Sequence, residues 1–130
     1  MRRLGFILGL TTVLVFLGCG DDLGTGLRGI AVVSGTGPLA ISVSTGVNPT
    51  ISWTGANAQR LTITAASGGG VFWDLEALNT STGFAAPVSH GQVPNDARER
   101  SESVTLTAGT EYRVRVVRTD GVENSRVFRP

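Results

Sequence analysis

The feature that most constrains the fold is the alternation of polar and apolar residues at 111–116, within the stretch EYRVRVVR, residues 111–118. The side chains on one side are Tyr112, Val114 and Val116, and those on the other side are Arg113 and Arg115. A period of two residues is that of a β-strand with one face in the core and the other in water. The stretch therefore predicts a half-buried strand that turns Arg113 and Arg115 outward.

A hairpin is predicted directly after this strand. The turn TDGV, residues 119–122, contains Asp120 followed by Gly121, and glycine tolerates the positive φ that a type I′ turn requires. The segment VENSRVFR, residues 122–129, resumes a strand pattern. The end of the sequence thus predicts an antiparallel strand pair.

Similar short segments recur through the rest of the chain, at residues 29–34, 39–45, 49–55, 59–66, 70–78 and 102–107. Their inward-facing residues are Ile51 with Trp53, Leu61 with Ile63 and Ala65, and Val104 with Leu106. Eighteen glycines and repeated Val, Ile and Thr favour strands and turns over helices. About eight short strands separated by frequent turns predict an all-β fold, an antiparallel β-sandwich.

The segment LTAGTEYRVRV, Leu106 to Val116, resembles the part of fibronectin type III domains that leads into strand F. Ala108 stands where that family usually has proline. The resemblance spans roughly residues 47–130 and implies that Trp53 is the core tryptophan of strand B. It also implies that the Tyr112 hydroxyl bonds to the backbone upstream, as in a tyrosine corner. Residues 68–100 follow no pattern of that family, so immunoglobulin-like sandwich is the broader description.

The first 18 residues have the three zones of a secretory signal peptide. Arg2 and Arg3 form a positive region, the apolar stretch Leu4 to Leu17 follows, and the small Gly18 precedes the cleavage position. A membrane-spanning helix needs about 20 apolar residues, so this segment is short for a permanent anchor. Export with cleavage is the favoured interpretation, and an uncleaved anchor is the alternative.

The residues around the cleavage position resemble the lipobox of bacterial lipoproteins. Phe16, Leu17, Gly18 and Cys19 occupy its four positions, and the last two match it well. The resemblance implies that the Cys19 sulfur receives a diacylglyceryl group and that Cys19 becomes the new N-terminus. Cys19 is the chain's single cysteine, so it has no disulfide partner within the chain. Ordinary secretion remains the other outcome of cleavage.

Three segments follow from this interpretation: a signal peptide at residues 1–18, a lipidated cysteine with a glycine-rich tether at 19–29, and a β-sandwich at 30–130. As a flexible coil, the ten residues after Cys19 would span about 17 Å. All eleven basic residues are arginine, and without the two in the signal peptide nine arginines face ten acidic residues. This balance predicts no basic patch for nucleic acid.

The sequence predicts no catalytic, metal or cofactor site. His90 is the single histidine and has turn residues around it, so we interpret it as a structural or exposed loop residue. Zinc is excluded because the exported part has one histidine and no free cysteine. Asp74 and Glu76 are two residues apart and share one strand face. A charged outer face explains them better than acid–base catalysis on sugars or calcium binding.

Phe72 and Trp73 are adjacent in a predicted strand, so alternation places their side chains on opposite faces. One ring then lies in the core, and the other is either covered by a loop or exposed. An exposed ring would suit stacking on a sugar, and the long segment 79–100 would suit a covering loop. We favour the covering loop and keep Phe72 and Trp73 as candidate ligand-stacking residues.

The sequence predicts a non-enzymatic lipoprotein of the bacterial cell envelope, attached to a membrane at the periplasmic face or the cell surface by lipidated Cys19. Its sandwich would contact another envelope protein. The alternative is a carbohydrate-binding module, with a glycan as partner and the Phe72 or Trp73 ring as its platform.

Overall fold

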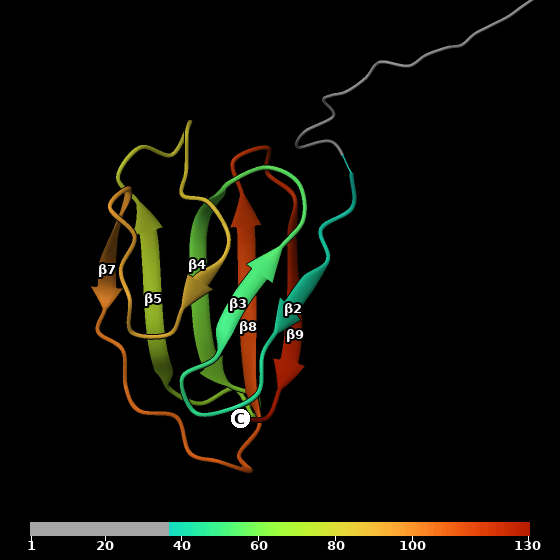
Figure 1. The fold of residues 1–130 in the computed structure, drawn as a ribbon, viewed down its shortest axis with the longest axis vertical. Helices are drawn as coiled ribbons and strands as arrows, with labels where there is room; N and C mark the ends of the chain where they lie inside the picture. Colours follow the sequence, from blue (N-terminus) through green and yellow to red (C-terminus); the bar gives the residue numbers. More distant parts are fainter. Residues whose placement is uncertain (1–36) are drawn as a thin grey trace, which may run out of the picture. The chain divides into compact units, whose positions relative to one another are not determined.

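Two antiparallel β-sheets face each other in the computed structural model, which describes residues 37–130 (Figure 1). These residues contain strands and no helix. The strands are β2 (Ile41–Val43), β3 (Thr50–Trp53), β4 (Ala58–Ala65), β5 (Val71–Ala77), β6 (Val88–Ser89), β7 (Ala97–Ser101), β8 (Tyr112–Arg118) and β9 (Glu123–Phe128). The predicted all-β sandwich is confirmed.

One sheet has three strands in the order β2-β3-β6, and the other has five in the order β7-β5-β4-β8-β9. β3 crosses in front of the larger sheet in Figure 1, and all neighbouring strands in both sheets are antiparallel. β8 is paired on both sides, with β4 and with β9. The strand with the clearest alternation is therefore an interior strand of the larger sheet.

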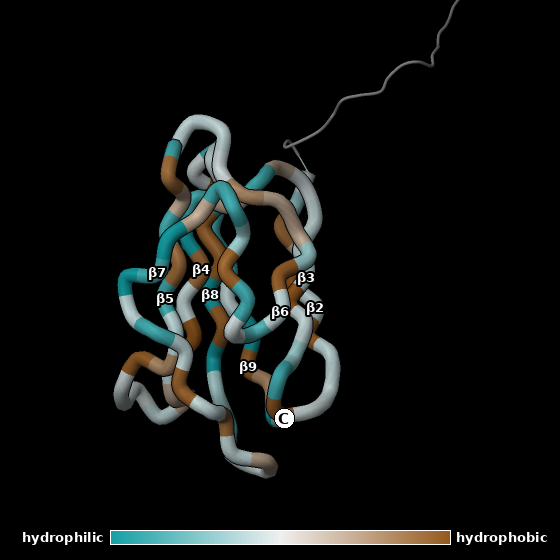
Figure 2. The backbone as a smooth tube through the Cα atoms, turned by 60° about the vertical axis from the view of Figure 1, so that its left-hand side comes forward, coloured by the Kyte–Doolittle hydropathy of each residue, from teal (hydrophilic) through white to brown (hydrophobic). Residues whose placement is uncertain are grey.

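The core lies between the two sheets and is filled by inward-facing residues of the strands, together with Phe84 and Leu106 from outside them. Its largest fully buried apolar side chains are Trp73, Tyr112, Phe84, Ile51, Leu61, Ile63, Leu75, Leu106, Val114 and Val116. Hydrophobic and hydrophilic residues alternate along β4 and β8 (Figure 2). Trp53, 7 % exposed, packs edge-on against Phe84 with ring centroids 6.0 Å apart. The inward placement of Ile51, Trp53, Leu61 and Ile63 is confirmed.

The segment 102–107 was predicted as a strand and is irregular instead. Leu106 is buried, but Val104 is 49 % exposed, so these two apolar residues do not both face the core. The edge strand of the larger sheet is β7, and four of its five residues belong to the segment 79–100, for which we predicted a loop. Its sequence ARERS has one apolar residue, and ion pairs to β5 replace the missing apolar pattern.

Tyr112 makes the hydrogen bond that the tyrosine-corner interpretation predicts. Its hydroxyl accepts a hydrogen bond from the backbone N–H of Thr107 at 2.8 Å. The ring is 1 % exposed and lies near the rings of Phe72 and Phe128. The contact ties the irregular segment before β8 to the core.

The predicted hairpin of β8 and β9 is present, with a four-residue loop, 119–122, in place of a two-residue turn. The backbone N–H of Gly121 donates to the carbonyl of Arg118, and Gly121 has a φ of 86°. Glycine is suited to this left-handed backbone because it has no Cβ.

Arg118 continues the inward series of β8, and its side chain is fully buried. Nε and Nη2 donate to the two carboxylate oxygens of Asp120. Nη1 donates to the carbonyls of Gly37 and Thr54, at 2.9 and 3.0 Å. One guanidinium thus joins the β8–β9 loop, the β3–β4 loop and the segment that leads into β2.

The backbone carbonyls at the edge of β2 are covered from β9. The Asn124 amide donates to the carbonyl of Leu39, and Nη1 of Arg126 donates to that of Ile41, both at 2.8 Å. These side chains link the edges of the two sheets and reduce the exposed hydrogen-bonding edge of β2.

Several predictions concern residues outside the described range. These are the signal peptide, Cys19, the tether and the strand at residues 29–34.

Replacing Trp53 by alanine tests the core. In a fragment of residues 30–130, which we expect to fold on its own, Trp53→Ala should lower the free energy of unfolding by about 3–5 kcal/mol because it leaves a large cavity. Denaturant unfolding measures this change. A loss below about 1 kcal/mol would place Trp53 outside the core.

Replacing Gly55 by alanine tests the packing around Arg118. A Cβ at Gly55 would overlap Nη1 of Arg118, and the residue has a φ of 90°. Gly68→Ala is the matched control, because Gly68 has a φ of 91° and no atom within 4 Å of the added Cβ. Thermal unfolding should show a larger loss of stability for Gly55→Ala than for Gly68→Ala. Equal losses of stability would show that backbone strain alone, and not the contact with Arg118, causes the effect.

Candidate functional site

The outer face of the five-stranded sheet carries most of the charged side chains of the strands. Residues that pair across β5, β4, β8 and β9 form three rows on this face. The rows are Glu76–Arg60–Val117–Glu123, Asp74–Thr62–Arg115–Ser125 and Val71–Thr64–Arg113–Val127. Arg98 and Arg100 of β7 extend this face through their ion pairs with β5. Five arginines and three acidic residues therefore share it. We call it the arginine face.

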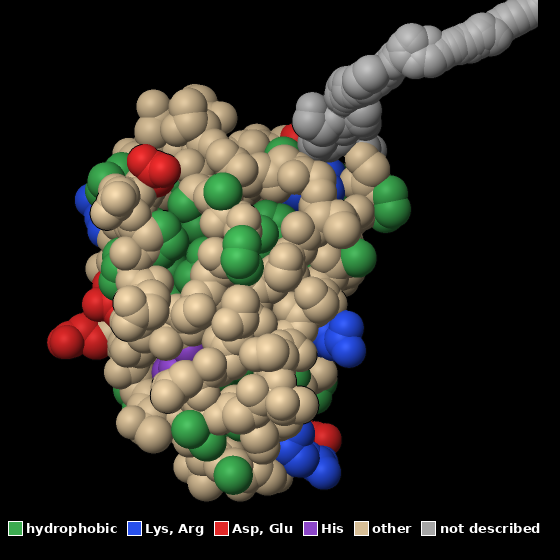
Figure 3. Space-filling model, in the orientation of Figure 1, with side chains coloured by type: hydrophobic (Ala, Val, Ile, Leu, Met, Phe, Trp, Pro, Cys, Tyr) green, Lys and Arg blue, Asp and Glu red, His purple; other side chains and the backbone are tan. Residues whose placement is uncertain are grey.

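The opposite outer face, over the three-stranded sheet, differs in chemistry. Its outward residues on β2, β3, β6 and their ends are Ala40, Ser42, Thr50, Ser52, Thr54 and Ser89. Figure 3 views this side, where backbone and uncharged polar atoms predominate and charged side chains lie toward the margins. The charge of the strands is thus concentrated on one side of the sandwich.

Asp74 is held at the centre of an ion-pair network. Nε and Nη2 of Arg60 donate to its two carboxylate oxygens at 3.0 and 2.7 Å, and the Thr62 hydroxyl donates at 3.2 Å. The hydrogen bond to Asp74 raises the pKa of Arg60. The Asp74 side chain is 9 % exposed, whereas that of Arg60 is 44 % exposed. The arginine therefore covers the acid.

Glu76 shares the face with Asp74, as alternation predicts, and binds two arginines of β7. Nη2 of Arg98 donates to it at 2.6 Å and Nη1 of Arg100 at 3.1 Å. The hydrogen bond from Arg98 is the main cause that lowers the pKa of Glu76, and Arg100 adds to it. A carboxylate held in this ionised form is poorly suited to act as a general acid near neutral pH.

A β-bulge positions Arg100. Asp74 pairs with Ser101 and Leu75 with Glu99, so Arg100 is the extra residue on β7. Its Nε lies 4.0 Å from Asp74 while its Nη1 reaches Glu76. One guanidinium thereby spans two neighbouring acids.

The β8 side of the face is less closely paired. Arg115 donates to Glu123 at 2.6 Å, which lowers the pKa of Glu123. The guanidinium of Arg113 has no ion-pair or hydrogen-bond partner among residues 37–130, and the Thr64 hydroxyl beside it in register has none there either. The free donors of the arginine face are therefore most numerous around Arg113.

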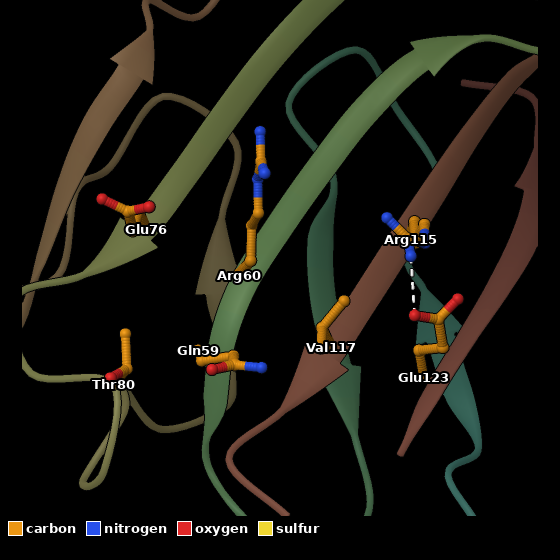
Figure 4. Close-up of a pocket in the computed structure, with 7 residues that line it drawn as sticks. All are labelled: Gln59, Arg60, Glu76, Thr80, Arg115, Val117 and Glu123. Atoms are coloured by element: carbon orange, nitrogen blue, oxygen red, sulfur yellow. Dashed lines mark hydrogen bonds and ion pairs between the residues drawn. The ribbon is translucent and has the colours of Figure 1, made fainter. Parts of the chain in front are cut away.

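A shallow groove of about 320 Å³ lies at the end of the face where Arg60 and Arg115 stand (Figure 4). It is lined by Gln59, Arg60, Glu76, Thr80, Arg115, Val117 and Glu123. Figure 4 shows Val117 on the same strand as Arg115, on the side nearer Arg60, and the dashed Arg115–Glu123 bond at one side. Its donors and acceptors are mixed and its charges balance, so it suits a polar ligand better than an isolated ion.

The prediction that Phe72 and Trp73 point to opposite faces is wrong. Thr64 pairs with Val71 and Ile63 with Trp73, so Phe72 is the extra residue of a β-bulge. Trp73 is fully buried, and Phe72 is partly buried against the core, with its ring 5.0 Å from that of Tyr112. Trp73 therefore offers no face to a sugar, and its indole N–H donates to Glu99 at 2.7 Å.

His90 is a buried structural residue rather than an exposed one. It is 6 % exposed, follows β6, and packs edge-on against Trp73 with ring centroids 5.2 Å apart. Its Nε2 atom has no hydrogen-bond partner among the described residues. Burial lowers the pKa of His90, because the charged form would lose its hydration.

Within residues 37–130, no group of three His, Cys, Asp or Glu side chains is placed to hold a metal ion. The same residues include no helix that is long and apolar enough to cross a membrane. Cys19, the predicted lipidation site, lies outside the described residues.

Comparisons of this chain with protein-family models, with curated proteins and with solved structures find no match.

The arrangement around His90 predicts a pH dependence of stability. Because the folded-state pKa lies below the unfolded value, the unfolded chain binds more protons as pH falls from 7.5 toward 5.5. Stability should fall over this interval. Denaturant unfolding of the 30–130 fragment at both pH values measures the loss, and His90→Phe should flatten it. An equal loss in His90→Phe would assign the dependence to other groups.

Proposed function

We propose that this chain is a lipid-anchored, non-enzymatic protein of the bacterial cell envelope, and that its β-sandwich is a binding domain. The anchor is proposed from the apolar segment ending in Phe16-Leu17-Gly18-Cys19. Diacylation of the cysteine would hold the protein firmly, since each buried methylene contributes about 0.8 kcal/mol. A partner of the sandwich would be another component of the envelope.

The observation that supports binding over catalysis is the state of the acids on the arginine face. Asp74 accepts three hydrogen bonds, and Glu76 and Glu123 are each paired with arginine. General acid–base catalysis needs a group that can take and return a proton near the working pH. Acids covered by arginines instead make a rigid, charged surface for recognition.

We further propose an immunoglobulin-like or fibronectin type III-like sandwich. The order β9-β8-β4-β5 supports it, because strands G, F, C and C′ are neighbours in that order in variable-type immunoglobulin domains. The Tyr112–Thr107 hydrogen bond adds support. β6 departs from the variable-type order, because it joins the smaller sheet before β7 extends the larger one.

A glycan-binding module that stacks sugars on Phe72 or Trp73 is not retained as a second proposal. Stacking needs an accessible aromatic face, and the Trp73 ring is fully buried while Phe72 packs against Tyr112. Any ligand surface must therefore use other side chains.

Replacing Cys19 by serine tests the anchor. The wild-type protein should be found in the membrane fraction, with a mature mass that starts at Cys19 and includes acyl chains. Cys19→Ser should lose this modification, because thioether formation requires the thiol. Intact-mass analysis of detergent-extracted protein measures both. An unmodified wild-type chain, or unchanged membrane attachment of Cys19→Ser, would overturn the proposal.

A further inference from the structure

The strongest unassigned feature is the part of the arginine face around Arg113, where hydrogen-bond donors remain free. Arg113 and Arg115 lie two residues apart on β8, which corresponds to about 7 Å along a strand. Thr64 and Thr62 of β4 stand directly opposite them in register. Val127 and Ser125 stand opposite them on the other side, from β9. We call these six residues the β8 patch.

The acids in the described part of the chain neutralise the charge of this patch only in part. On the β5 side of the face, acids and arginines satisfy one another closely. Among the hydrogen bonds within residues 37–130, Arg115 donates one to Glu123 and Arg113 donates none. A guanidinium has five N–H donors in a planar fork that matches a carboxylate. The patch therefore offers two forks in line to an incoming anionic group.

We infer that the β8 patch binds an acidic polysaccharide of the envelope, with carboxylates on Arg113 and Arg115. The inference rests on the proposed binding function and names its ligand. Charge complementarity supplies the attraction. The hydroxyls of Thr64 and Ser125 suit sugar hydroxyls, and Val71 and Val127, 47 % and 44 % exposed, suit the apolar C–H faces of sugar rings.

Two other occupants fit the patch less well. Protein interfaces are anchored by buried Trp, Tyr or large apolar side chains, whereas the exposed large apolar residues in the described part are valines and Leu78. An anionic membrane surface attracts net positive charge, at about 1 kcal/mol per basic residue. The three acids of the arginine face weaken this attraction, and its valines are too short to insert deeply.

A binding assay with the full-length protein in micelles of a neutral detergent tests the inference. The probes are surfaces coated with polygalacturonate, with dextran, with polyglutamate and with phosphatidylglycerol vesicles. The protein should bind polygalacturonate and should not bind dextran, which has the sugar rings without the carboxylates. Raising the salt concentration should weaken binding, because the contact is between charges.

Arg113→Gln and Arg98→Gln form the matched pair of variants. Each removes one positive charge from the arginine face, but Arg98 belongs to the paired part, where Arg100 still holds Glu76. Arg113→Gln should weaken polygalacturonate binding by about tenfold, as expected for losing a charge-assisted bidentate contact. Arg98→Gln should change it by less than about twofold. Arg113→Gln should keep the wild-type unfolding temperature, and Arg98→Gln should lower it only slightly, because Arg100 still holds Glu76.

Equal weakening by the two variants would reduce the effect to net charge and overturn the assignment to the β8 patch. Binding to polyglutamate or to phosphatidylglycerol vesicles as tight as to polygalacturonate would overturn the polysaccharide as occupant. Absence of polygalacturonate binding would also overturn it. The assay does not depend on acylation, so an unmodified Cys19 would refute the anchor alone and leave this result standing.

Discussion

The buried guanidinium of Arg118 is the interaction on which one end of the sandwich depends. A cation fully removed from water is costly unless its partners replace the lost hydration. Here Asp120 supplies the opposite charge, and carbonyls of Gly37 and Thr54 accept from the remaining edge. Those two carbonyls lie 81 and 64 residues before Arg118 in the chain. The charge is satisfied only when all these segments are in their native positions.

This requirement also explains why Gly55 borders the site. The guanidinium lies so close to the backbone of Gly55 that no Cβ could fit between them. Asp120 is held ionised, because the hydrogen bond with Arg118 lowers its pKa. The β8–β9 hairpin, the β3–β4 loop and the start of the described chain therefore form one unit through a single side chain.

Alternation predicted the inward residues of β3, β4 and β8, because these strands are regular where they face the core. The same pattern, continued by one step from Val116, places Arg118 inward, and Asp120 two residues later is the natural partner. That signal was present in the sequence and could have identified the buried pair. It requires treating an arginine as a core residue, against its usual preference for the surface.

The errors have a common physical cause in β-bulges and edge pairing. The bulge at Phe72 turns two adjacent rings toward the core, and no local residue pattern predicts it. β7 was missed because its pairing depends on Arg98 and Arg100 meeting Glu76, which is 22 and 24 residues away in the sequence. Asp74 and Glu76 were correctly placed on one face, but their arginine partners come from β4 and β7 and depend on the strand order. The candidate site was therefore predictable strand by strand and not as a surface.

The chemistry of this surface depends on its basic residues being arginines. The planar guanidinium of Arg60 holds Asp74 through two hydrogen bonds and leaves other N–H groups directed elsewhere. A lysine ammonium cannot do this with the same geometry. Internal acids thus orient some arginines while Arg113 keeps its full set of donors, so recognition of an external anion need not break the network that holds the face in shape.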